Sequence, residues 1–208
     1  SVLEQDSLRA LHTPEVPVSG IYRFVADSYG LGHFIEILPD GQQAVWHGGQ
    51  GHGWMAHFLT VPASGDGIVI LTNSERSWPF MAHVLSDWAR WRGFGSVKMG
   101  RIIAATRVVW ALIGLVVLVS LWQVARLVWG LRSDARRFAP LAGDFRWVRL
   151  LQAVLGLGVM GALAWSVAQP YLMVSSIFPG AVGWAGVALL AWAVVMVLSA
   201  ACPRRVEI

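Results

Sequence analysis

The chain has 208 residues, of which 56% are hydrophobic, and its mean hydropathy is +0.57. Charged residues make up only 13%, whereas soluble globular proteins carry about 25%. These values exclude a protein that is soluble throughout. The net charge of +4 is small and the arginines cluster beside apolar runs, which is typical of membrane flanks. We therefore expect a lipid bilayer as a partner, and no nucleic acid.

The beginning of the chain is polar and lacks the apolar segment of a signal peptide. Residues 7–12 predict a short helix that ends at Thr13-Pro14, and Pro17 extends the connector that follows. The topology derived below places this end outside the cytoplasm. We therefore expect residues 1–208 to be the C-terminal portion of a longer precursor. The single cysteine, Cys202, excludes a disulfide within the chain.

Four apolar segments separated by turn signals predict an antiparallel meander. The predicted strands are residues 30–38, 42–47, 54–61 and 68–71. The first turn, Pro39-Asp40-Gly41, is explicit because proline presets φ and glycine accepts a positive φ. The last strand is wholly apolar, which predicts burial on both of its faces.

A helix is predicted after the sheet, from an N-cap at Ser77 to Gly93. Pro79 lies in its first turn, where a missing N–H costs nothing. Its apolar residues recur with helical spacing on one face: Trp78, Met81, Ala82, Leu85, Trp88 and Ala89. We expect this helix to cover the sheet with its tryptophans in the core. Residues 1–97 are therefore predicted to be α+β, an antiparallel sheet covered by a C-terminal helix.

Residues 98–208 predict an all-α region of three membrane spans, at about residues 104–129, 149–168 and 180–202. Val108 to Ala125 carries no charge and can cross about 30 Å of hydrocarbon. The later uncharged stretch is divided by Gln169-Pro170 and by residues 178–180. A re-entrant segment around residues 172–178 is the main alternative to a simple connection.

The arginines predict the orientation of these spans. Loop 130–149 holds five arginines, residues 169–180 hold no Lys or Arg, and the tail holds Arg204 and Arg205. The positive-inside rule places loop 130–149 and the C-terminus in the cytoplasm, and residues 1–97 outside it. No acid or lysine lies at mid-depth of a span, which argues against a transporter or pump and favours a plain anchor.

The stretch from Val45 to Gly53 reads Val-Trp-His-Gly-Gly-Gln-Gly-His-Gly. It predicts a strand that ends at His47 and opens into a glycine loop, where a ligand or another backbone can approach closely. Taken alone, His47-Gly48-Gly49 also fits a histidine at a strand end beside a structural glycine bulge.

An ordered series of motifs surrounds this stretch. It consists of Tyr29-Gly30-Leu31-Gly32, the Asp40-Gly41 turn, His47-Gly48-Gly49 with Gly53, Val61-Pro62 and residues 68–74. In order and spacing the series resembles the C-terminal segment of the serine β-lactamase-like hydrolases, which include class C β-lactamases, D-alanyl-D-alanine carboxypeptidase-like proteins and related esterases. Residues 8–14 are similar to the segment that precedes it in that family. The resemblance covers about residues 1–94.

The resemblance implies a membrane-tethered serine hydrolase that forms an acyl-enzyme with a small-molecule, peptide or ester substrate and needs no cofactor. It implies that His47 and Gly48 contact the substrate, and that His47, Gly49 and Gln50 belong to the catalytic site. The backbone N–H of Gln50 would be one of two donors to the oxyanion. Histidine at position 47, where the family often has lysine, favours a general acyl hydrolase over an efficient β-lactamase.

The other two elements of the family, Ser-x-x-Lys and Tyr-x-Asn, do not occur in these 208 residues. The chain therefore lacks a nucleophile and a base of this kind, and we expect it to be inactive by itself.

Two other classes of function fit parts of the pattern. His47, His52 and His57 recur every five residues, with His33 on a neighbouring strand, and histidine is a common metal ligand. No carboxylate or cysteine lies near His52 and His57 in the sequence, so we expect no metal. A non-catalytic extracytoplasmic domain that binds or senses a ligand is the alternative to an enzyme. A Ser-x-x-Lys upstream in the full reading frame would distinguish the two.

Overall fold

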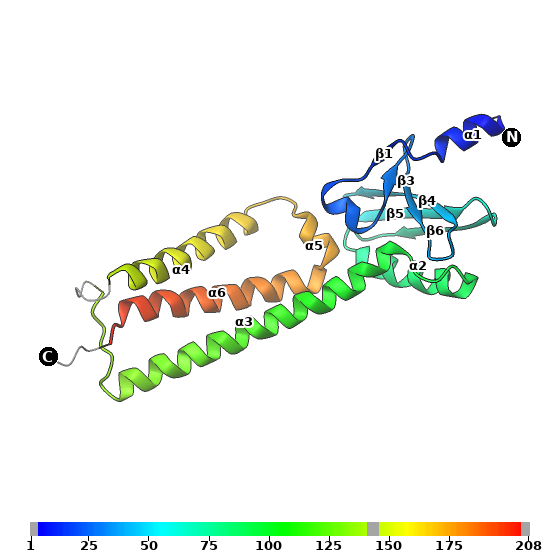
Figure 1. Ribbon diagram of the computed structural model, residues 1–208. Helices are drawn as coiled ribbons and strands as arrows, with labels where there is room; N and C mark the ends of the chain where they lie inside the picture. Colours follow the sequence, from blue (N-terminus) through cyan, green and yellow to red (C-terminus); the bar gives the residue numbers. More distant parts are fainter. Residues whose placement is uncertain (1–3, 141–145, 205–208) are drawn as a thin grey trace. The chain divides into compact units, whose positions relative to one another are not determined.

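The computed structural model describes residues 4–140 and 146–204 (Figure 1). It divides into two compact units, residues 1–107 with 176–178, and residues 108–175 with 179–208. Predictions that involve Ser1, residues 141–145 of the arginine-rich loop, or Arg205 lie outside the described residues.

The first unit contains a six-stranded antiparallel sheet whose strands follow one another in sequence order. The strands are β1 (Val16–Pro17), β2 (Ser28–Tyr29), β3 (Phe34–Ile37), β4 (Gln43–Gly51), β5 (Trp54–Val61) and β6 (Asp66–Thr72). The predicted antiparallel meander is confirmed, and two short strands at its beginning extend it. A short helix, α1 (Gln5–Leu11), and a 3₁₀ helix, η1 (Gly20–Phe24), flank β1. The Gly41 turn between β3 and β4 has the positive φ, +86°, that the sequence predicts.

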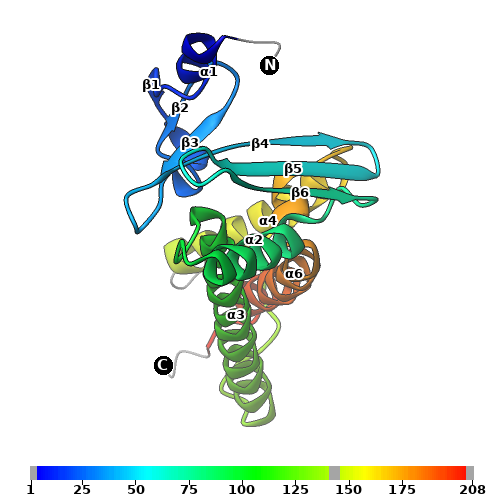
Figure 2. The same cartoon turned by 90° about the vertical axis from the view of Figure 1, so that its right-hand side faces the viewer.

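Helix α2 (Trp78–Arg92) covers one face of the sheet, which both views show (Figures 1 and 2). Its buried residues are Met81, Ala82, Leu85 and Ala89, and Trp78 and Trp88 pack against the same core. The helix ends at Gly93 with a φ of +84°. The predicted helix and its apolar face are therefore confirmed. Ser77 occupies the N-cap position, but its hydroxyl donates to the Ser74 carbonyl instead of capping the helix.

The prediction that the last strand is buried on both faces is wrong. Ile70 is buried, whereas Val69 and Leu71 are 68% and 76% exposed. Strand β6 is the last strand of the sheet, and α2 covers only the face to which Ile70 belongs. An apolar strand with one uncovered face gives the same sequence pattern as a strand buried on both faces.

Three helices among the described residues are long and apolar enough to cross a membrane: Lys98–Arg132, Trp147–Val167 and Pro179–Ala201. They correspond to the 3₁₀ turn η2 (Lys98–Gly100) with α3 (Arg101–Arg132), and to α4 (Arg146–Val167) and α6 (Pro179–Ala201). A short helix, α5 (Met173–Ile177), lies where the sequence allows a re-entrant segment.

Helices α4 and α6 lie side by side in the second unit (Figure 1). A side chain at Gly156 would place its Cβ 2.8 Å from the Ala193 carbonyl oxygen, so glycine is required there for close packing. A Cβ at Gly158 or Gly161 would meet nothing within 4 Å. Only the first of these three glycines therefore serves helix packing in the described structure.

Candidate functional site: a strand edge at the end of β4

Strand β4 continues through the glycines, which corrects the prediction that the strand ends at His47 and opens into a loop. Its pairing with β5 runs from Val45 opposite Thr60 to Gly51 opposite Trp54. Gly48, Gly49 and Gly51 adopt negative φ values, and only Gly53, in the turn, has a positive φ, of +80°. Glycine permits a loop but does not impose one, and the ladder with β5 holds these residues extended.

The pairing of β4 with β3 stops earlier, where Trp46 lies opposite Phe34. Residues 47–51 are therefore in a ladder on the β5 side, while β3 does not reach them on the other side. This segment of β4, residues 47–51, is called the strand edge below.

The antiparallel register decides which backbone groups point to this edge. The Leu38 N–H donates to the Gln42 carbonyl at 2.8 Å, so Gln42 directs its backbone groups toward β3. Directions alternate along a strand, so Ala44 and Trp46 do the same, and Gly48 and Gln50 continue the series beyond the end of β3. The predicted oxyanion donor, the Gln50 N–H, is thus directed to the strand edge. The Gln50 side chain extends elsewhere and donates to the Glu75 carbonyl at 3.4 Å.

His47 projects from the face of the sheet opposite α2. It lies opposite Phe58 of β5 and is half-buried. Its ring centroid is 5.8 Å from that of Phe34 and 6.4 Å from that of Tyr29. Aromatic rings thus fix one side of the imidazole, and it makes no ion pair within residues 4–140 and 146–204.

The glycines of the edge differ in what requires them. A Cβ at Gly51 would lie 2.4 Å from the Trp54 Nε1, and a Cβ at Gly49 would lie 3.3 Å from the same indole. A Cβ at Gly48 would meet the Ala56 oxygen at 3.5 Å and the His57 Nδ1 at 3.6 Å, which are ordinary contacts. Packing of Trp54 therefore explains glycine at 51 and favours it at 49, and no contact in the sheet requires glycine at 48.

The histidines with the five-residue repeat do not converge. His57 lies opposite Gly48, so its side chain is on the α2 face, and His47 is on the other face. No group of three or more His, Cys, Asp or Glu among the described residues could hold a metal ion.

His57 is buried, and the sequence does not indicate this burial. It is 3% exposed, and its ring centroid is 5.1 Å from that of Trp46. Its Nε2 has no hydrogen-bond partner among the residues that the structure describes. Burial, with a smaller contribution from the nearby His47, lowers the pKa of His57 from 6.5 to about 4. His57 is therefore neutral and belongs to the core.

A second buried ionisable residue, Glu36, lies on β3 with 1% exposure. Its Oε2 accepts a hydrogen bond from the Lys98 N–H at 3.2 Å, and its Oε1 has no hydrogen-bond partner within residues 4–140 and 146–204. Burial raises the pKa of Glu36 from 4.5 to about 7, against the opposing effect of the Lys98 N–H and the Lys98 charge. The sequence contains an indication of this burial, because Glu36 is the one charged residue within the apolar run from Phe34 to Ile37.

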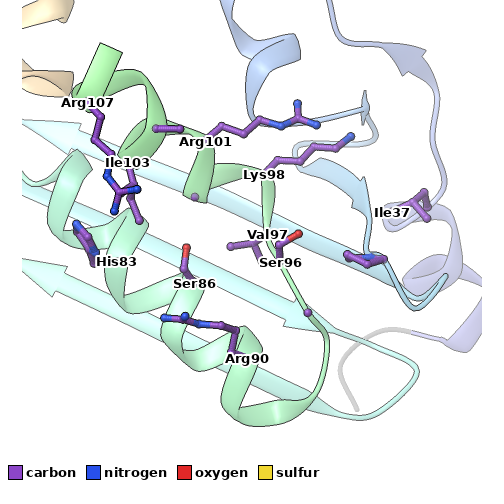
Figure 3. Close-up of a pocket in the computed structure, with 14 residues that line it drawn as sticks. Ile37, His83, Ser86, Arg90, Ser96, Val97, Lys98, Arg101, Ile103 and Arg107 are labelled. Atoms are coloured by element: carbon purple, nitrogen blue, oxygen red, sulfur yellow. The ribbon is translucent and has the colours of Figure 1, made fainter. Parts of the chain in front are cut away.

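A pocket of about 650 Å³ lies between α2 and the beginning of α3 (Figure 3). Its polar lining consists of Arg90, Lys98, Arg101, Arg107, His83, Ser86 and Ser96. Sequence reasoning missed this pocket because its residues come from separate segments that only the fold brings together.

The described residues thus define a class: an α+β unit with one covering helix, joined to apolar helices that can cross a membrane. No protein-family model matches the sequence, and no curated protein matches it either. The assignment of function therefore depends on the chemistry of the strand edge and the pocket.

Proposed function

We propose that this chain belongs to a membrane-tethered serine hydrolase of the β-lactamase-like superfamily that acts through an acyl-enzyme. The observation that carries the proposal is the strand edge, where residues 47–51 extend past Phe34, the first residue of β3, with the Gln50 N–H directed outward. A rigid strand N–H is a preorganised donor for the oxyanion that develops during acyl transfer.

Four residues of the edge, His47 to Gln50, have a role in this proposal. The carbonyl oxygen of the substrate accepts a hydrogen bond from the Gln50 N–H. Gly48 and Gly49 leave the strand free of side chains, so that the acyl group lies along it. His47 contacts a polar group of the substrate from the face opposite α2. The nucleophilic serine and its base come from a segment outside these 208 residues, since no Ser-x-x-Lys occurs in them.

The arginine distribution supports an extracytoplasmic location for this site. Loop 130–149 and the tail carry the arginines, and the connection between the second and third spans carries none. The substrate is then an ester or amide that is available outside the cytoplasm.

The test uses the full-length protein in membranes and a fluorescent fluorophosphonate or labelled penicillin. We expect covalent labelling of a serine upstream of residue 1 and a loss of about tenfold or more in the labelling rate of His47→Ala. The matched control is His52→Ala, which removes a histidine from the turn of the same hairpin and should label at the wild-type rate. Absence of labelling in folded, inserted protein would instead favour a ligand-binding or sensing domain.

A further inference from the structure

The pocket at the beginning of α3 concentrates positive charge. Among the 14 residues that line it are three arginines, a lysine and a histidine, and none is Asp or Glu. His83, Ser86 and Arg90 lie three and four residues apart on α2 and therefore share one face of that helix. In the view of Figure 3 they extend along one side of the pocket, with Arg107 of α3 beyond them.

The cations of the pocket are engaged to different degrees. Lys98 pairs with Asp27, Arg90 pairs with Asp87, and the Arg101 Nη1 donates to the Phe24 carbonyl at 3.1 Å. Arg107 makes no ion pair within the described part of the chain. The Ser86 hydroxyl donates to the Ala82 carbonyl and so keeps its lone pairs available to accept. The pocket thus presents an excess of positive charge, with no acidic side chain among the described residues that line it.

The position of the pocket along α3 relates it to the bilayer. Arg107 is followed directly by the uncharged run from Val108 to Ala125, which fills the hydrocarbon thickness. Arg107 is therefore at the level of the lipid headgroups. The walls also contain Ile37, Ile103 and Ala104, and Ile37 is 52% exposed. An apolar wall beside a cationic one fits a ligand that has both an anionic group and an apolar portion.

We propose that this pocket binds the phosphate of an anionic membrane lipid, with Arg107 as the principal contact and Arg90 and His83 as secondary ones. Binding there holds the first turns of α3 and the adjacent α2 against the membrane surface. The proposal does not depend on the hydrolase activity, because none of its residues belongs to the strand edge.

The test uses the full-length protein in vesicles of phosphatidylcholine and phosphatidylglycerol in equal parts. A phosphatidylglycerol with a photoreactive group near its headgroup is cross-linked, and the modified segment is identified by mass spectrometry. We expect modification within residues 83–107, and about a fivefold loss of it in Arg107→Gln, which removes one cation at an anionic surface.

Matched variants separate this site from general attraction to the membrane. Arg92→Gln removes a nearby arginine of α2 that pairs with Asp66 and does not line the pocket, and it should cross-link like the wild type. Arg107→Lys keeps the charge and should retain most of the cross-link. Arg90→Gln, with an expected smaller loss, carries the same test if Arg107→Gln does not fold.

Three results would overturn the proposal. The first is equal modification of residues 83–107 in wild type and Arg107→Gln. The second is equal modification by a photoreactive phosphatidylcholine, which would mean contact with bulk lipid. The third is displacement of the phosphatidylglycerol probe by millimolar inorganic phosphate, which would assign the pocket to a free anion.

Discussion

The two halves of strand β4 share one extended backbone but have different surroundings. Ala44, Val45 and Trp46 are 0%, 1% and 3% exposed. All three pair with β3, and Val45 and Trp46 also pair with β5. His47 to Gly51 are more exposed and have a ladder with β5 only. The first half belongs to the core, and the proposed function depends on the second half. A site on a strand of this kind is rigid because the adjacent part of the strand is fixed in the core.

The largest expected effect is on the buried half. Trp46→Ala removes a ring that is 4.5 Å from Phe34, centroid to centroid, and should lower the free energy of unfolding by about 3–5 kcal/mol. Chemical unfolding in detergent, followed by near-UV circular dichroism, measures this loss. His47→Ala, one residue further on, should change the same quantity by less than about 1 kcal/mol. Equal losses in the two variants would mean that the strand has no such division.

The next prediction concerns the pH dependence of the free energy of unfolding, to which the buried Glu36 and the buried His57 contribute in opposite directions. The raised pKa of Glu36, about 7, means that the native state holds its proton where the unfolded chain releases it. The contribution of Glu36 to the free energy of unfolding therefore rises as the pH falls from 7 to 4.5. The lowered pKa of His57, about 4, has the opposite effect, because the unfolded chain takes up a proton near pH 6.5 and the native state does not. The contribution of His57 to the free energy of unfolding therefore falls as the pH falls from 6.5 to 4.

We therefore expect the effects of the two residues on the free energy of unfolding to offset each other between pH 4.5 and 6.5. In Glu36→Gln only the His57 effect remains, so the free energy of unfolding should fall by on the order of 3 kcal/mol on acidification. In His57→Phe only the Glu36 effect remains, so the free energy of unfolding should rise by a similar amount as the pH falls from 7 to 4.5. Unfolding at a series of pH values measures both. Identical pH profiles for the two variants would contradict the burial assigned to these side chains.

The smallest effect is on the exposed half. Gly51→Ala places a Cβ against the Trp54 indole, and this ring is 49% exposed and can move aside. The stability loss should be at most about 1 kcal/mol, with a clear shift of the Trp54 indole N–H resonance, assigned through Trp54→Phe. Gly48→Ala is the control, since its Cβ makes only ordinary contacts, and it should leave this resonance in place.

Local periodicity predicted much of this fold. Strand β5 has the predicted bounds, Trp54 to Val61, and α2 buries the predicted face. These patterns repeat within a few residues and need no knowledge of the rest of the chain. The continuation of β4 through its glycines was not predicted, because a partner strand decides whether glycines are extended. The resemblance indicated the Gln50 N–H, but its direction depends on the register between β3 and β4, which the sequence does not show.

The pocket was even less predictable from local sequence patterns than the continuation of β4. Arg90 and Arg107 are 17 positions apart in sequence, and nothing in the spacing of either segment indicates that they line one cavity. The burial of Glu36 is similar, since it depends on the approach of Lys98 to β3. Sequence patterns give the elements, whereas sites of this kind arise from contacts between elements.

The most direct test of the proposed role of the strand edge removes a single backbone donor. Gln50→Pro in the full-length protein deletes the N–H that is directed away from β5, a position where the ladder does not need it. Gln50→Ala keeps this N–H and is the matched control. The rate of acylation by a fluorophosphonate should fall by about 10²–10³-fold in Gln50→Pro and stay near the wild-type rate in Gln50→Ala. Equal rates in the two folded variants would show that the Gln50 N–H does not stabilise an oxyanion, and would contradict the proposed role of this edge.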